Sequence, residues 1–211
     1  MSASGIVLRI AVLIAAVLIA ARITAEFRES LDFVVMPHNE IAVHRSIMLA
    51  TAAFIVLLAI PFVPGAEIGL TMLAVFGPPI APLVYAATVI ALTLSFLVGR
   101  LLPPSVVAGG LRALRLARAA EAVETAAPLP REARLARLMQ GGAPWLLRLA
   151  TRFRYVAILI AINVPGNFLI GGGGGIALMA GMSGLFAPLP FVLTVALAVA
   201  PVPLAIHLFG G

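Results

Sequence analysis

The sequence has no cysteine and no lysine, and few of its 211 residues carry a charge. Without cysteine, disulfides, zinc–thiolate sites and thiol catalysis are excluded. Charged residues make up 10% of the chain and hydrophobic residues 63%, whereas soluble domains have about 25% and 45–50%. This composition excludes a water-soluble globular domain and indicates an integral membrane protein.

The few charges are also unevenly distributed. Residues 46–99 contain one acidic residue, Glu67, and residues 155–211 contain no Asp, Glu or Arg. A membrane-spanning helix takes about 20 residues, so each apolar block is too long for two spans and too short for three. In each block we therefore expect a segment that enters the membrane without crossing it.

Three further segments complete the predicted organisation. Residues 1–22 are predicted to form an N-terminal transmembrane helix, with a signal peptide as the alternative and the N-terminus in the cytoplasm in either case. Residues 23–46 form an acidic, amphipathic connection, and residues 103–154 form an arginine-rich, amphipathic loop. The excess of arginine places this loop in the cytoplasm by the positive-inside rule.

The arginines of this loop recur at intervals of three. Each trio is predicted to fan over one side of a helix on the anionic inner leaflet, and the AAPLP segment at residues 126–130 separates the two helices. No basic motif interleaved with aromatic residues occurs, so we expect no nucleic-acid partner. The two trios are Arg112, Arg115 and Arg118, and Arg131, Arg134 and Arg137.

The same tripeptide interrupts both apolar blocks. VPG stands at residues 63–65 and at residues 164–166, and APL follows at residues 81–83 and 187–189. Because the order of segments around these motifs is also shared, we interpret the two halves as an internal duplication.

The charges give this duplication an inverted topology. Arg100 ends a span in the cytoplasm, so the preceding hairpin must enter and leave the membrane from outside, and its twin from the cytoplasm. The predicted fold is an all-α membrane protein with two repeats at residues 47–102 and 155–211. Each repeat is a re-entrant Pro-Gly hairpin (residues 47–78 and 155–185) followed by a transmembrane helix, and the two tips approach the midplane as in secondary transporters.

The first tip carries Pro64, Gly65 and the lone acid Glu67. A charge at mid-bilayer costs about 2.5–3.5 kcal/mol on insertion scales, so Glu67 is predicted to carry a proton or to meet a cationic group. The alternative is a carboxyl group that is stabilised at a short helix N-terminus after the Pro-Gly pair.

At the second tip, Asn163 and Asn167 flank Pro165 and Gly166. Their amides bind either ligand oxygen atoms or backbone groups that the turn leaves unpaired. The glycine run that follows, which includes Gly171, Gly172 and Gly173, allows close backbone approach or forms a phosphate cradle, and both interpretations stay open.

Charge and catalysis complete the list of candidates. Arg100, Arg152 and Arg154 are predicted to face lipid headgroups at the cytoplasmic surface. The apolar blocks hold no Ser/His/Asp grouping, metal-binding motif or paired carboxylates. We therefore expect no enzyme activity, no metal and no cofactor.

Parts of the chain resemble the DedA family, also called SNARE-associated or VTT-domain proteins. These parts are the segment IPFVPGAEIGL at residues 60–70, the segment LVYAATVIALTLSFLVGR at residues 83–100, and the second Pro-Gly hairpin with the final span. The similarity covers residues 47–208. It implies two re-entrant hairpins and the movement of phospholipids or polyprenyl-phosphate carriers across the bilayer, often dependent on the proton gradient. Glu67 stands one residue later than the family's usual acid, and asparagines flank the second proline where the family usually has arginines.

These observations lead to a hypothesis and two alternatives. The leading hypothesis is a DedA-type lipid translocase in a bacterial inner membrane, with membrane lipids as partners and homo-oligomerisation left open. The first alternative is a small-solute or ion transporter on the same scaffold. The second is a non-transporting protein that organises partners through its arginine-rich loop.

Overall fold

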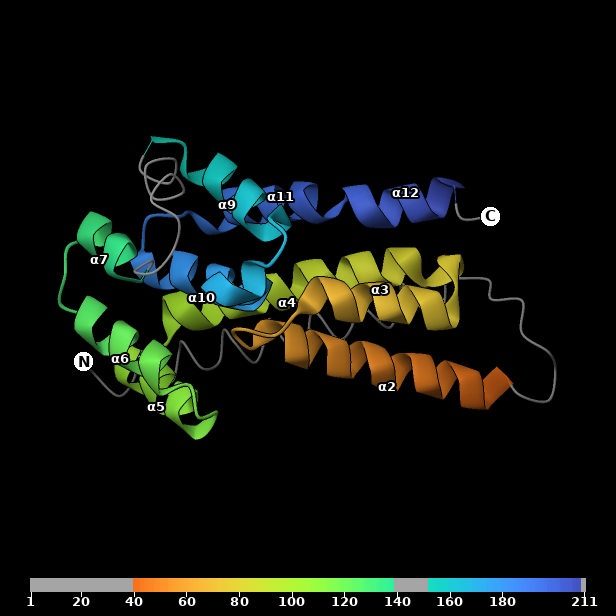
Figure 1. The fold of residues 1–211 in the computed structure, drawn as a ribbon, viewed down its shortest axis with the longest axis horizontal. Coiled ribbons are helices and arrows are strands. Elements are labelled where there is room, and N and C mark those ends of the chain that lie inside the picture. Colours follow the sequence, from red (N-terminus) through yellow and green to blue (C-terminus); the bar gives the residue numbers. More distant parts are fainter. Residues whose placement is uncertain (1–39, 139–151, 210–211) are drawn as a thin grey trace.

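A computed structural model describes residues 40–138 and 152–209, and every element in these ranges is helical (Figure 1). The all-α class predicted from the sequence is thus confirmed. The N-terminal helix predicted at residues 1–22 and most of the acidic connection lie outside the described residues. In chain order the elements are α2 (Glu40–Ala59), α3 (Gly65–Phe76), η1 (Pro78–Ile80), α4 (Ala81–Leu101), α5 (Pro104–Ala113), α6 (Ala117–Ala126), α7 (Arg131–Leu138), α9 (Arg154–Asn163), η2 (Asn167–Ile170), α10 (Gly172–Ser183), α11 (Pro188–Val199) and α12 (Pro201–Phe209).

The first VPG segment separates two helices that fold back on each other. The prolines at 61 and 64 lack the N–H that a continuing helix needs, so α2 ends at Ala59 and α3 starts at Gly65. Gly65 lies directly against Leu58, and the Phe54 ring lies against Gly69. The helix α2 begins at Glu40, whereas the sequence pattern places the start of this hairpin at residue 47.

The second VPG segment has the same effect with a longer turn. Helix α9 ends at Asn163, and α10 starts at Gly172 after the short helix η2. The turn needs Gly166 and Gly171, both of which have positive φ angles that side chains disfavour. In Figure 1 the α2–α3 pair and the α9–α10 pair open toward opposite ends of the long axis of the molecule.

Helix α4 lies at the centre and packs against α2, α10 and α11. Its contact with α10 is made by backbone, because a Cβ atom at Gly99 or Gly181 would clash with the carbonyl oxygen of Leu178 or Phe96. Small residues allow such close approach between helices. The Phe96 ring also stacks on Phe191 of α11 at 4.1 Å between ring centroids.

Two helical stretches in the described part of the chain have the length and hydrophobicity of a membrane span. They cover residues 78–101, which include α4, and residues 188–206, which run through α11 into α12. The first is half buried inside the protein, whereas the second is largely exposed.

Helices α5, α6 and α7 form a separate layer at one end of the molecule (Figure 1). As predicted, the AAPLP segment ends α6 and separates it from α7. The first arginine trio, however, does not lie on one helix. Arg112 lies in the last turn of α5, Arg115 in the connection and Arg118 in the first turn of α6.

The break between α5 and α6 is a Schellman motif. The N–H of Leu116 donates to the Leu111 carbonyl at 2.8 Å, and the N–H of Arg115 donates to the Arg112 carbonyl at 2.9 Å. These two bonds satisfy carbonyl groups that the helix end leaves free. Arg115 takes the left-handed conformation, φ +61°, which glycine usually occupies at this position.

Candidate functional site

The turns of the two helix pairs contact each other through their backbones. The N–H of Phe62 donates to the carbonyl of Gly171 at 2.6 Å. Phe62 itself has a φ of +67°, an unusual conformation for a bulky residue. The segments at residues 60–64 and 171–175, far apart in the sequence, thus form one junction.

The glycine run lets the two backbones come this close. A Cβ atom at Gly172 would lie 2.8 Å from the Val63 carbonyl oxygen, and one at Gly174 would clash with the Leu58 carbonyl oxygen. The observed arrangement is close packing, and all five glycines are buried. Gly173 meets Leu92, which lies near the middle of α4.

A buried hydroxyl group fixes the junction to α4. The Ser95 Oγ donates to the Gly174 carbonyl at 2.7 Å. A buried carbonyl without a partner costs free energy, so this bond stabilises the first turn of α10. Sequence analysis missed Ser95 and Phe62, although a serine that breaks an apolar span is a recognisable signal.

The asparagines of the second turn bind backbone. The Asn163 amide donates to the carbonyls of Leu159 and Ala198, both at 2.9 Å. The Asn167 amide donates to the Ile162 carbonyl at 2.7 Å. These bonds hold the end of α9 and its link to α11, while Pro165 and Gly166 are exposed.

Glu67 lies away from the junction. It is exposed in the first turn of α3, after Pro64, the N-cap residue, and the buried Gly65. The shallow groove beside it is lined by α3 residues alone. Its carboxylate makes no hydrogen bond or ion pair with the part of the chain that the structure describes. The described contacts therefore do not bring Glu67 together with Asn163, Asn167 or the glycine run.

Two of the three predicted headgroup arginines, Arg100 and Arg154, contact the connection between α10 and α11. Arg100 donates to the Phe186 carbonyl at 3.0 Å and Arg154 to the Leu185 carbonyl at 3.0 Å. Arg134 donates to the Met182 carbonyl at 3.2 Å. Positive charge is favourable at a helix C-terminus, so these side chains stabilise the end of α10. Arg152 is exposed and lies over the Phe153 ring.

A cavity of about 250 Å³ adjoins the junction. It lies between the two turns, α9, α10 and the α5–α7 layer. Apart from Arg118, the described residues that line it have no polar side chain. They are Pro61, Phe62, Leu111, Arg118, Ala119, Ala122, Val123, Leu135, Leu138, Ala157, Ile158, Ala161, Leu169, Ile170, Gly171, Gly175, Ile176, Leu178, Met179, Ala180, Met182 and Phe186.

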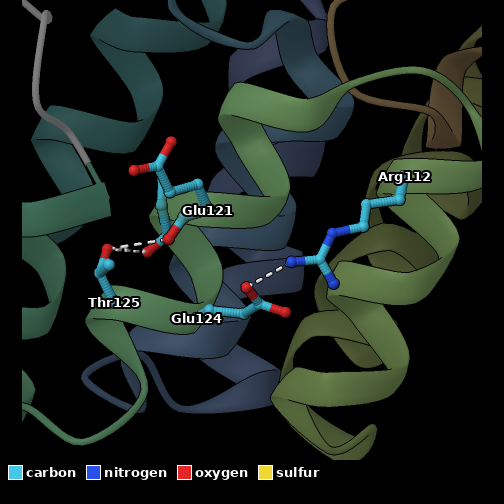
Figure 2. A network of polar contacts seen from close by, with 5 residues as sticks. Arg112, Glu121, Glu124 and Thr125 are labelled. Carbon is cyan, nitrogen blue, oxygen red and sulfur yellow. Dashed lines mark hydrogen bonds and ion pairs between the residues drawn. The ribbon is translucent and has the colours of Figure 1, made fainter.

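The outer side of the α5–α7 layer is polar. Figure 2 shows Arg112 of α5 reaching Glu124 of α6, and Glu121 and Thr125 on the same helix. The Arg137 Nε donates to the Thr125 Oγ1 at 3.0 Å. These contacts connect the three short helices around the cavity. Within residues 40–138 and 152–209, no group of three His, Asp or Glu side chains is placed to hold a metal ion.

Comparison with known proteins identifies no relative. No family model matches the chain, and neither the curated proteins nor the solved structures contain a significant match.

Proposed function

We propose that this protein is an integral membrane protein that moves lipids across a bacterial inner membrane, as DedA-type proteins do. In this proposal the two spans cross the bilayer and the helix pairs α2–α3 and α9–α10 enter it from opposite sides. The α5–α7 layer, with its arginines, then faces the cytoplasm, in accordance with the positive-inside rule.

Exposed apolar side chains support the membrane location. Along α11 and α12, Leu189, Leu193, Leu197 and Leu204 are 58–70% exposed. Soluble monomers rarely expose a large contiguous apolar surface, whereas lipid chains solvate such a surface well. The location of α4 at the core and of α11–α12 at the outside agrees with a small membrane bundle.

The junction of the two turns is the observation that carries the proposal. Non-helical backbone is tolerated at membrane depth only where it is buried in protein or lines a cavity. The point where the turns meet satisfies this condition, because Phe62 and Gly171 are hydrogen-bonded to each other and line the cavity, whereas Pro165 and Gly166 of the second turn are exposed. Gly173, two residues after Gly171, lies beside Leu92, which is near the middle of the first span. Paired broken helices at the midplane are a feature of transporters.

The chemistry of the cavity favours a lipid over a polar solute. Asn163 and Asn167 do not line the cavity, and their amides donate to backbone carbonyls. Apart from Arg118, the described residues of the cavity wall are apolar. A sugar, amino acid or ion needs several polar partners to replace its water. Among the described residues that line the cavity, Arg118 alone offers such a partner.

Lipid translocation in proteoliposomes tests this function. The purified chain is reconstituted with a fluorescent phospholipid, and an impermeant quencher reports how much of the probe reaches the outer leaflet. The protein should carry probe from the inner to the outer leaflet. We therefore expect the quenched fraction of the probe to rise with the amount of protein. Glu67→Gln tests proton coupling under an imposed pH gradient, with Glu132→Gln on α7 as the matched control.

Other outcomes distinguish the alternatives. Uptake of a small solute or an ion without lipid movement would replace the proposal with a solute transporter on the same scaffold. Absence of both activities in a folded, reconstituted protein would overturn transport. The arginine-rich layer would then be tested for partner binding by substitution of its arginines with glutamine.

A further inference from the structure

The cavity beside the junction is large enough, and its wall apolar enough, to bind hydrocarbon. Its volume is about 250 Å³ and its wall consists of aliphatic and aromatic side chains with one exception. An apolar cavity of about 150 Å³ stays free of water and binds benzene. The larger cavity here therefore suits an apolar segment of a ligand. Because ligand pockets usually measure about 300–1,000 Å³, it fits one chain better than two.

The exception is Arg118. The side chains of Arg115 and Arg131 likewise have no hydrogen bond or ion pair with a described residue, but Arg118 is the one described arginine that lines the cavity. Arg112 is paired with Glu124, Arg134 with backbone carbonyls, and Arg137 with Thr125. Arg118 is exposed, lines the cavity, and has no hydrogen bond or ion pair with any residue in the described ranges. Its guanidinium thus has all five N–H donors available in a planar arrangement that suits a carboxylate or a phosphate.

None of the described residues that line the cavity is acidic. The nearest acid along the helix is Glu121, one turn further on, and its carboxylate is outside the cavity wall. No negatively charged residue in the described part of the wall would repel an anion bound at Arg118. A cationic headgroup would be repelled by the guanidinium, and a neutral headgroup would accept a hydrogen bond without the added charge attraction.

We propose that the cavity binds one hydrocarbon chain of an anionic amphiphile, with the acidic headgroup held by Arg118. This site deepens the proposed function and rests on its membrane location, because amphiphiles reach the cavity from the inner leaflet. The ligand class is defined by shared chemistry, an acidic headgroup on a single apolar chain. A fatty acid supplies a carboxylate and a lipid monoester supplies a phosphate.

Photolabelling of the full-length protein in nanodiscs tests the site. Three probes carry the same photoreactive alkyl chain and differ only in the headgroup: a carboxylate, a monophosphate and a neutral alcohol. Labelled peptides are identified by mass spectrometry. We expect the anionic probes to label peptides of α6, α9 and α10 that line the cavity, and their relative strength distinguishes carboxylate from phosphate.

Two variants with matched controls separate headgroup recognition from chain binding. Arg118→Gln should weaken labelling by the anionic probes about ten-fold, whereas Arg115→Gln, outside the cavity, should not. Ala161→Leu narrows the cavity and should weaken labelling by all probes, whereas Ala113→Leu on the exposed side of α5 should not.

Three results would overturn the site. They are equal labelling by the neutral probe, labelling that is unchanged in Arg118→Gln, and no labelling of cavity peptides, which would mean that other parts of the chain fill the cavity. Because binding is measured without transport, the two proposals fail separately. Labelling without lipid movement would leave the site and remove the translocase, and the reverse result would remove the site alone.

Discussion

Single glycines decide where the backbones of this protein meet. Glycine in a helix costs up to about 1 kcal/mol relative to alanine, yet α10 begins with four of them. The contacts explain this composition, because a Cβ atom at Gly174 or Gly181 would clash with a carbonyl oxygen of α2 or α4. At these positions the need for close packing decides the residue type, although glycine is a poor helix former.

Gly174→Ala should destabilise the protein by about 1–3 kcal/mol, the usual cost of overpacking. The added methyl group has no space, because the Leu58 carbonyl oxygen occupies it. Gly109→Ala is the control, since nothing lies within 4 Å of that position on α5 and the change should be neutral or stabilising. Denaturant titration in detergent, followed by circular dichroism, measures both, and equal stability of the two variants would contradict the packing.

Ser95→Ala should also destabilise the protein, by about 1–3 kcal/mol, because it leaves the buried Gly174 carbonyl without a partner. The control is Thr93→Ala, since the Thr93 hydroxyl only bonds to a carbonyl of its own helix, that of Val89. The same titration compares them. If Thr93→Ala cost as much as Ser95→Ala, the contact between α4 and α10 would not depend on this bond.

At the scale of the element, the end of α10 shows how charge is used inside the fold. Three arginines from α4, α7 and α9 donate to carbonyls in the last turn of α10 and in the connection that follows it. The Arg134 side chain also donates to the carbonyls of Ala127 and Leu129. One side chain therefore holds the start of α7, the end of α6 and the end of α10 together.

Arg134→Gln should loosen the α10–α11 connection. The shorter, neutral side chain loses the bonds to the carbonyls of Met182, Ala127 and Leu129. The Met182 carbonyl lies in the last turn of α10. We expect faster hydrogen exchange of the amides at residues 183–187, measured by mass spectrometry. Arg137→Gln is the control, because Arg137 only reaches Thr125, and its exchange in this segment should match that of the unmodified protein.

The boundaries of the elements show how far the sequence can be interpreted. Proline marks the helix ends after α2, α6 and α9 because it removes an N–H in any context. The break between α5 and α6 was not predicted, since its left-handed residue is Arg115 rather than glycine. The roles of Ser95 and Phe62 also depend on partners about 80 and 110 positions away, which periodicity cannot locate.

At the scale of the whole molecule, the arrangement has two distinct ends. The start of α4, which η1 precedes in the chain, lies at one end, and the α5–α7 layer lies at the other (Figure 1). The repeated tripeptide predicted the positions of both turns. It did not predict their difference, since the second turn includes an extra short helix and the first does not.

Cysteine labelling should place these ends on opposite sides of a membrane. Single cysteines are introduced at Pro79 and Ser105, both exposed, in a chain with no native cysteine. We expect an impermeant maleimide to label Pro79→Cys from outside intact cells and Ser105→Cys only after permeabilisation. Ala187→Cys should behave as Ser105→Cys does. Labelling of all three from one side would contradict the proposed topology.

The junction between the turns has a consequence for how this scaffold can diversify. Its contacts are made by main-chain atoms, so residues 172–174 have no side chain with which to adjust a ligand. The cavity wall, in contrast, has positions at which a larger side chain would change the shape of the cavity. Among them are Ala122, Ala157 and Ala161. A version of the cavity for a longer or bulkier ligand would therefore differ at these three positions and keep the junction as it is.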